Sequence, residues 1–112
     1  MIVYFGISII LRESRDGEAV LRDRIVYMYY VYLLENQNDK SWYIGETSDL
    51  RQRVKQHNSA QGGQTTKRKR DWKLIYYEAY LIKQDAFGRE RFLKSGSGRT
   101  YLKKQLKHYL AT

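Results

Sequence analysis

Arg53 and His57 are a pair of residues whose types and spacing could do chemistry. They lie four positions apart, so on a helix they share a face and sit one turn from each other. That face would present a permanent cation beside a group that titrates near neutral pH, and such a pair can bind an anion and move a proton. The alternative interpretation is an ordinary basic helix surface that contacts water.

Glu90 is a carboxylate at a position that the helical pattern assigns to the core-facing side. Offsets of four and three place it beside Ala86, Phe87 and Leu93. Burying a carboxylate without a partner is costly, so we expect Glu90 to pair with a cation or a metal, or to line a cleft. The alternative partner is a neighbouring arginine such as Arg89 or Arg91.

Tyr32 and Tyr43 are candidates only in combination with these residues. The chain has 11 tyrosines, and a tyrosine in a strand is ordinarily an amphipathic core residue. These two lie in short aromatic runs on either side of a polar segment. Taken singly, neither tyrosine indicates a function.

Hydrophobic patterns predict the elements that must position these side chains. Three segments are rich in β-branched and aromatic residues, which is typical of strands, and three have the spacing of amphipathic helices. The strands are expected over residues 25–34, 41–45 and 72–80, and the helices over residues 49–58, 84–94 and the segment after residues 95–98, which end the second helix. Asp49, with Gln52 three residues later, is expected to cap the first helix. The first two strands should form an antiparallel hairpin, and the helices should pack on the sheet.

The amino-terminal residues differ in character from the rest of the chain. Residues 12–24 are charged and mixed, which indicates a solvated linker or a short surface helix. The hydrophobic residues 1–11 are expected to form an added edge strand or to be poorly ordered. We therefore divide the chain into a dispensable extension, residues 1–24, and one domain, residues 25–112, and expect that deleting residues 1–23 leaves a folded protein.

Composition limits the class of protein. With 112 residues, 42% of them hydrophobic, the chain can build one modest core. Without cysteine it has no disulfides, no thiolate zinc site and no cysteine nucleophile. No apolar run approaches the roughly 20 residues that span a bilayer. Residues 1–11 lack the pattern of a secretory signal, so the expected location is the cytoplasm.

The net charge of +9 is concentrated in the second half of the chain. Residues 1–50 hold 5 Lys and Arg against 8 Asp and Glu, whereas residues 51–112 hold 16 against 4. A basic surface of this kind suits a polyanion such as a nucleic acid, although a solvated, solubilising face is the alternative. The basic run that follows a Gly-containing loop is expected to hold a nucleic-acid backbone; it consists of Lys67, Arg68, Lys69 and Arg70.

In their order along the chain, these residues resemble a known family. Tyr-Val-Tyr at residues 30–32, followed after ten residues by Tyr-Ile-Gly at residues 43–45, resembles the paired motif of the GIY-YIG nucleases. That family places an arginine ten residues after the second tyrosine, and many members place a histidine four residues later. Arg53 and His57 match these positions. The family's metal-binding glutamate lies on a later helix, where Glu90 matches it.

The similarity covers about residues 27–110 and includes a tail, residues 94–102, that is common in small stand-alone members. Two positions depart from the family pattern. Tyr30 stands where the family name has glycine. Many members also carry an asparagine on the last helix, and here no asparagine follows Asn58, so Gln105 or Ser97 would have to replace it.

The resemblance implies an α/β (α+β) fold, with a small three-stranded antiparallel sheet flanked by helices, and a metal-dependent endonuclease. One Mg²⁺ or Mn²⁺ would be held mainly by Glu90, Arg53 would stabilise charge on the phosphate, and a tyrosine would steer or deprotonate water. The base is either Tyr32 or Tyr43. Because a phenol has a pKa of about 10, the positive charges of Arg53, His57 and the metal would have to lower it.

The implied substrate is DNA, which could be branched or damaged, and the implied role is in DNA repair or recombination. RNA is not excluded. Arg99, in the family-like tail, joins the basic run as an expected nucleic-acid contact. Two other functions fit the residues. One is a nucleic-acid-binding module, for DNA or RNA, that keeps the fold but does not cut. The other is a protein-interaction adaptor with an exposed tyrosine surface, against which the charge of the second half argues.

Overall fold

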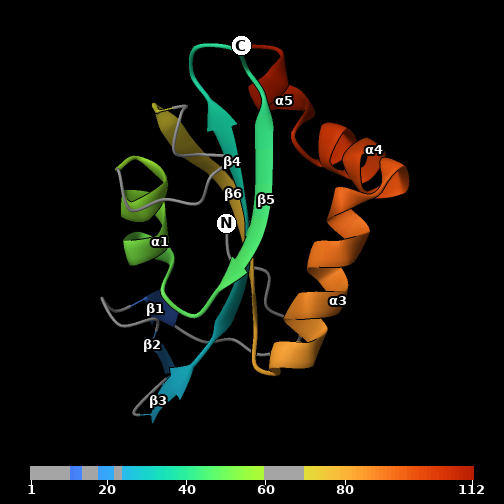
Figure 1. Ribbon diagram of the computed structural model, residues 1–112. Coiled ribbons are helices and arrows are strands. Elements are labelled where there is room, and N and C mark those ends of the chain that lie inside the picture. The colour runs from blue at the N-terminus through green and yellow to red at the C-terminus, as the bar shows by residue number, and fades with distance from the viewer. Residues whose placement is uncertain (1–10, 14–17, 22–23, 60–69) are drawn as a thin grey trace.

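A computed structural model describes residues 11–13, 18–21, 24–59 and 70–112 of the chain (Figure 1). Two sequence predictions therefore fall outside the described residues. One is the edge strand or poor order of residues 1–10, and the other is the placement of Lys67, Arg68 and Lys69.

The central sheet has three antiparallel strands in the order β5-β4-β6. They are β4 (Tyr29–Asn36), β5 (Trp42–Thr47) and β6 (Trp72–Tyr80). The middle strand β4 pairs with both neighbours, and it is buried along almost its whole length. This confirms the predicted α+β fold with a three-stranded antiparallel sheet.

A side-chain network shapes the turn between β4 and β5. Oδ1 of Asn36 accepts hydrogen bonds from the backbone N–H groups of Asn38 and Asp39, at 3.0 and 3.2 Å. The Asp39 carboxylate in turn accepts from the backbone and hydroxyl of Ser41. Lys40 takes the left-handed conformation, with φ of 62°, which closes the turn. The chain thus reverses in the polar segment that the sequence placed between two strands.

Helices cover both faces of this sheet (Figure 1). On one face lies α1 (Leu50–His57); on the other lie α3 (Lys83–Lys94), α4 (Gly96–Gln105) and the short α5 (Lys107–Leu110). Alternate residues of β4 point to opposite faces, as a strand requires. Tyr30, Tyr32 and Leu34 pack in the core cluster beside α1, whereas Val31 and Leu33 pack in the cluster beside α3 and α4.

Two details of the carboxy-terminal helices differ from the sequence prediction. Residues 95–98 end α3 as predicted, but the next helix was expected only after them, whereas α4 already begins at Gly96. Ser95 makes this possible because its hydroxyl accepts from the Gly98 N–H at 3.1 Å and so caps the new helix. A Cβ at Gly98 would lie 2.0 Å from the Phe92 carbonyl oxygen, so this junction requires glycine. The expected single terminal helix is also divided at Leu106.

The amino-terminal segment forms a second antiparallel sheet, so the prediction of a linker or a short surface helix over residues 12–24 is wrong. Its strands are β1 (Leu11–Glu13), β2 (Glu18–Leu21) and β3 (Arg24–Tyr27). The sequence carries Asp16-Gly17 between the first two strands, a dipeptide that favours hairpins and that outweighs the charged composition. The strand predicted over residues 25–34 is interrupted at Met28. That residues 1–24 are dispensable stays a prediction.

Within the described part of the chain, no helix has the length and apolar character needed to cross a membrane.

Candidate active site

Tyr32, in the middle of β4, lies at the centre of the candidate site. Its side chain is only 1% exposed, and its hydroxyl is 2.8 Å from Nε2 of His57. The phenol also lies against the backbone of Gly45, its partner across the β4–β5 pair. A Cβ at Gly45 would be 2.4 Å from the Tyr32 hydroxyl. The glycine of the Tyr-Ile-Gly motif is therefore required by the close approach of Tyr32.

Interactions at both ends of α1 hold His57 in place. At the start, the Asp49 carboxylate accepts from the backbone N–H of Gln52 at 3.1 Å, as the sequence predicted. At the end, the Asn58 amide donates to the Trp72 carbonyl at 2.9 Å and accepts from the Trp72 N–H at 2.7 Å. His57 is 3% exposed, so the interpretation of its helix face as a wet surface is wrong for this residue.

Tyr43 completes an aromatic group with Tyr32 and His57. Its ring centroid lies 4.5 Å from that of His57 and 6.3 Å from that of Tyr32. The strand register explains this placement, because Tyr43 pairs with Leu34, two residues along β4 from Tyr32, on the same face of the sheet. The structure thus brings together three of the residues that the sequence singled out.

The ionisation of this group differs from the sequence expectation. Burial, together with the charge of Arg53, lowers the pKa of His57 from 6.5 to about 4, so the imidazole is neutral at pH 7. Burial and the neighbouring Tyr43 raise the pKa of Tyr32 above 10, although the charge and hydrogen bonding of Arg53 oppose this. The expectation that His57 supplies positive charge to lower a tyrosine pKa is therefore wrong. Tyr32 keeps its proton and faces a neutral imidazole.

Glu90 lies half-buried on α3, where its Oε2 is 3.2 Å from Nζ of Lys94. The arginine partners considered from the sequence are replaced by this lysine. The negative charge of Glu90 acts on Tyr32 and also on Glu46 of β5, whose pKa is raised by burial and by Glu90. Arg53 acts on both Tyr32 and Glu46 in the opposite sense. Tyr32, Arg53, Glu46 and Glu90 therefore share one electrostatic environment.

Glu46 was missed by sequence reasoning, although it directly follows the Tyr-Ile-Gly motif. The predicted strand ended at residue 45, whereas β5 continues to Thr47 and carries Glu46 beside Val31 of β4. A longer strand reading would have placed this carboxylate next to the tyrosine motif.

The donor set of the site fits a divalent ion that takes few protein ligands. Glu90 and Glu46 offer carboxylate oxygens, the donors that Mg²⁺ and Mn²⁺ prefer. Among the described residues, no three or more His, Asp or Glu side chains gather as a metal-binding cluster. Mg²⁺ is ordinarily bound by one or two carboxylates together with water and substrate phosphates, so two carboxylates suffice.

A buried ion pair fixes α3, the helix that carries Glu90. Glu78 of β6 is 2% exposed and accepts from Nε and Nη2 of Arg89 at 2.9 and 3.0 Å. The hydroxyls of Tyr76 and Tyr80 donate to the same carboxylate. Arg89 lies above the ring of Tyr101, 4.5 Å from its centroid. Because Arg89 is the residue before Glu90, this network sets the rotation of the helix at the site.

Comparison with known proteins follows the same residues. The model of the GIY-YIG catalytic domain matches residues 28–105. The chain belongs to the GIY-YIG family. This confirms the resemblance that the two tyrosine motifs carried, and it places the chain in a nuclease-type family.

Three relatives share the name UPF0213 protein. A "UPF0213 protein" of Streptococcus pneumoniae serotype 4 is 42% identical over 65 residues, 58% of this chain and 65% of the relative. "UPF0213 protein YazA" of Bacillus subtilis is 43% identical over 56 residues, 50% of this chain and 57% of the relative. The chain thus spans less than two thirds of these two relatives. A "UPF0213 protein" of Staphylococcus epidermidis is 36% identical over 75 residues, 67% of this chain and 90% of the relative. No solved structure matches the chain.

The remaining predicted site residues lie outside the group formed by Tyr32, Tyr43 and His57. Arg70 is exposed at the start of β6, and its carbonyl oxygen accepts from Nδ2 of Asn36 at 2.8 Å. Arg99 is exposed on α4, on the other face of the sheet from α1. Ser97 and Gln105, the proposed replacements for the family asparagine, are exposed on the same helix.

The lowered pKa of His57 predicts how the stability of the GIY-YIG domain depends on pH. The unfolded chain binds the His57 proton below about pH 6.5, whereas the folded domain binds it only near pH 4. The stability associated with neutral His57 is therefore fully present above pH 6.5 and is lost as the pH falls towards 4. We expect the melting temperature of His57→Gln to depend less on pH across this window than that of the parent. His108→Gln, at an exposed histidine on α5, should keep the parent's dependence of melting temperature on pH. Equal slopes in the parent and His57→Gln would contradict the assignment.

Proposed function

We propose that this GIY-YIG domain is a metal-dependent endonuclease that hydrolyses phosphodiester bonds in DNA. The observation that carries the proposal is the 2.8 Å hydrogen bond between Tyr32 and a neutral His57. Arg53 and Glu90 act electrostatically on the same hydroxyl. Such a group combines a proton path, a fixed cation and a metal-binding carboxylate, which are the parts that phosphodiester hydrolysis requires.

The proton path runs from water through Tyr32 to His57. Because Tyr32 is protonated at neutral pH, it acts as a relay rather than as a phenolate. The water passes a proton to the phenol oxygen while the phenol passes its own proton to Nε2 of His57. The hydroxide then attacks phosphorus while the bond from phosphorus to the leaving sugar oxygen breaks. The leaving oxygen takes a proton from solvent, and His57, left as the imidazolium, returns its proton to solvent. Tyr43, half-buried against His57, orients that water.

Two charged groups stabilise the reacting phosphate. The guanidinium of Arg53 offsets the negative charge that develops on the phosphoryl oxygens. Glu90, with Glu46 as a second carboxylate, would hold the Mg²⁺ or Mn²⁺ ion. When bound, that ion supplies positive charge for a phosphoryl oxygen and for the leaving oxygen.

A plasmid-nicking assay tests the proposal. The full chain should nick supercoiled or branched DNA with Mg²⁺ or Mn²⁺ and should be inactive with a chelator. Tyr32→Phe should lower the nicking rate about a hundredfold or more, because it removes only the hydroxyl of the relay. Tyr43→Phe is the matched variant and should lower the rate less. If Tyr43→Phe is the more damaging, the relay runs through Tyr43 instead. If the chain binds DNA but nicks no form of it, the function is that of the non-cutting module. Competition between DNA and RNA would then show which nucleic acid the module prefers.

The basic run at residues 67–70 is proposed to hold the DNA backbone. Replacing all four residues by Ala should weaken binding to different DNA sequences to the same extent and reduce the dependence of log K on log salt by up to about 3.6, because each phosphate contact contributes about 0.9. Fluorescence anisotropy with two unrelated duplexes at several salt concentrations measures both quantities. An unchanged affinity and an unchanged salt slope would show that the run does not contact DNA.

A further inference from the structure

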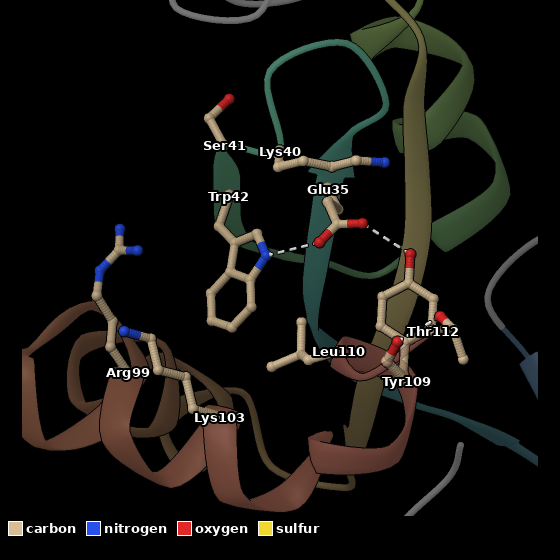
Figure 2. A pocket seen from close by; sticks show the side chains of 9 residues that line it. All are labelled: Glu35, Lys40, Ser41, Trp42, Arg99, Lys103, Tyr109, Leu110 and Thr112. Atoms are coloured by element: carbon tan, nitrogen blue, oxygen red, sulfur yellow. Dashed lines mark hydrogen bonds between the residues drawn. The ribbon is translucent and has the colours of Figure 1, made fainter.

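A pocket of about 800 Å³ lies away from the tyrosine group, between the β4–β5 hairpin and helices α4 and α5 (Figure 2). It is on the sheet face opposite α1, because the Glu35 side chain that lines it alternates with the core residues beside that helix. Its lining includes Glu35 and Trp42 of the hairpin strands, Arg99 and Lys103 of α4, and Tyr109 and Leu110 of α5. Neither the proton relay nor the carboxylates of the proposed function uses it.

Glu35 gives this pocket a buried and oriented carboxylate. The residue is 5% exposed, its Oε2 accepts from Nε1 of Trp42 at 3.2 Å, and its Oε1 accepts from the Tyr109 hydroxyl at 2.7 Å. Figure 2 shows the carboxylate between these two aromatic side chains. A carboxylate has about four lone-pair sites over its two oxygens. Each oxygen of Glu35 can therefore accept one more hydrogen bond, and the Trp42 and Tyr109 bonds fix where those acceptors lie.

Cationic side chains line the same pocket. Lys40, Arg99 and Lys103 line the pocket and are exposed, so they can meet an anion that enters from solvent. The half-buried indole of Trp42 and the side chain of Leu110 supply flat and apolar surface. The matching ligand has a planar ring, N–H donors for Glu35 and a phosphate for the cations. A nucleotide has this combination of groups.

We propose that this pocket binds an unpaired guanine nucleotide of a nucleic-acid strand. The Watson–Crick edge of guanine offers two adjacent N–H donors, one for each oxygen of Glu35. Adenine, cytosine and uracil lack two adjacent N–H donors on that edge, because each places an acceptor directly beside its donor, and that acceptor would face a carboxylate oxygen unfavourably. The phosphate of the nucleotide would meet Arg99 and Lys103. The proposal rests on the proposed function only in taking the nucleotide to be part of a strand.

The indole N–H of Trp42 gives a direct probe, because it donates to Glu35. We expect GMP to shift the Trp42 indole signal in ¹H–¹⁵N spectra of the full chain in a saturable way, while the buried Trp72 indole moves less. AMP, CMP and UMP should bind about tenfold more weakly. Equal shifts with AMP, or with inorganic phosphate alone, would reduce the pocket to a general anion site and overturn the proposal. The absence of a saturable shift with millimolar GMP would do the same.

Variants separate recognition from folding. Glu35→Gln should abolish the preference for GMP over AMP, because the amide replaces one of the two acceptor oxygens with an NH2 donor and so cannot face two adjacent N–H donors side by side. Lys103→Ala should weaken GMP binding, whereas Lys104→Ala, the exposed neighbour outside the pocket lining, should not. If both lysine variants bind GMP as the parent does and Glu35→Gln keeps the preference, the proposal fails.

A further comparison identifies the source of the nucleotide. If the natural ligand is part of a strand, an oligothymidine with one central guanine should bind more tightly than GMP. If the natural ligand is a free nucleotide, this oligonucleotide should bind no more tightly than GMP. These measurements need neither metal nor cleavage. Failure of the nuclease proposal therefore leaves them interpretable.

Discussion

Glu90→Gln is expected to abolish Mg²⁺-dependent nicking while the thermal melt stays close to that of the parent. Glutamine keeps the size of the side chain but removes the charge that would hold the ion. Because charge stabilisation by a bound metal is worth several kcal/mol, the rate should fall about a thousandfold or more. The stability should change by less than about 1 kcal/mol, since the Glu90–Lys94 pair is an i,i+4 pair with an exposed lysine.

Lys94→Ala is the matched control for this experiment. It breaks the same ion pair, of 3.2 Å, but leaves the carboxylate in place. A structural role for Glu90 predicts that both variants melt earlier and nick alike, whereas a metal-binding role predicts that only Glu90→Gln loses activity. Parent-like nicking by Glu90→Gln would refute the proposed metal site. A parent chain inactive on every DNA form would leave the non-cutting module as the function.

Glu78→Ala is expected to have the largest effect on stability. It leaves the Arg89 guanidinium without the carboxylate that accepts its two hydrogen bonds and removes the acceptor of the Tyr76 and Tyr80 hydroxyls. Breaking a buried pair by removing one partner costs about 3–5 kcal/mol, a large share of the roughly 5–15 kcal/mol that stabilises a small domain. Urea unfolding at pH 7 measures this loss directly.

The pH dependence of Glu78 provides a second check. Burial alone would raise the pKa of Glu78, but hydrogen bonds from Arg89, Tyr76 and Tyr80 outweigh burial and lower it. The stabilisation is therefore present above the unfolded carboxyl's pKa of about 4.5 and is lost as the pH falls below it. Glu78→Gln should remove this loss of stability at acid pH. The loss occurs mainly at lower pH than the loss assigned to His57. If Glu78→Ala were as stable as the parent at pH 7, α3 would be held by its apolar contacts alone.

The sequence predicted the elements in which local pattern and tertiary environment agree. The strands β5 and β6, the first helix with its Asp49 cap and the helix that carries Glu90 lie close to their predicted bounds. The amino-terminal sheet was missed because its strands are only three or four residues long, too short to show a clear strand pattern in the sequence. The division at Leu106 was missed because an apolar stripe continues across both helices.

At the site, the residue types were predictable but their environments were not. Motif spacing singled out Tyr32, Tyr43 and His57, and the structure places their side chains together. The spacing could not show that His57 is buried and neutral, because that state depends on packing against a strand 25 residues away. The Glu78–Arg89 pair and the pocket around Glu35 also join distant segments, so no local pattern revealed them.

The double hydrogen bond between Asn58 and Trp72 has a consequence for chain length. It closes the segment between these residues at its base, so the end of α1 is anchored to β6 whatever lies between them. The entropy of closing such a loop grows only with the logarithm of its length, at about 0.6 kcal/mol for each doubling. Insertions between residues 59 and 70 should therefore be tolerated by the domain, with His57 still held against Tyr32. This is the position at which a peptide tag or an extra recognition element could be added.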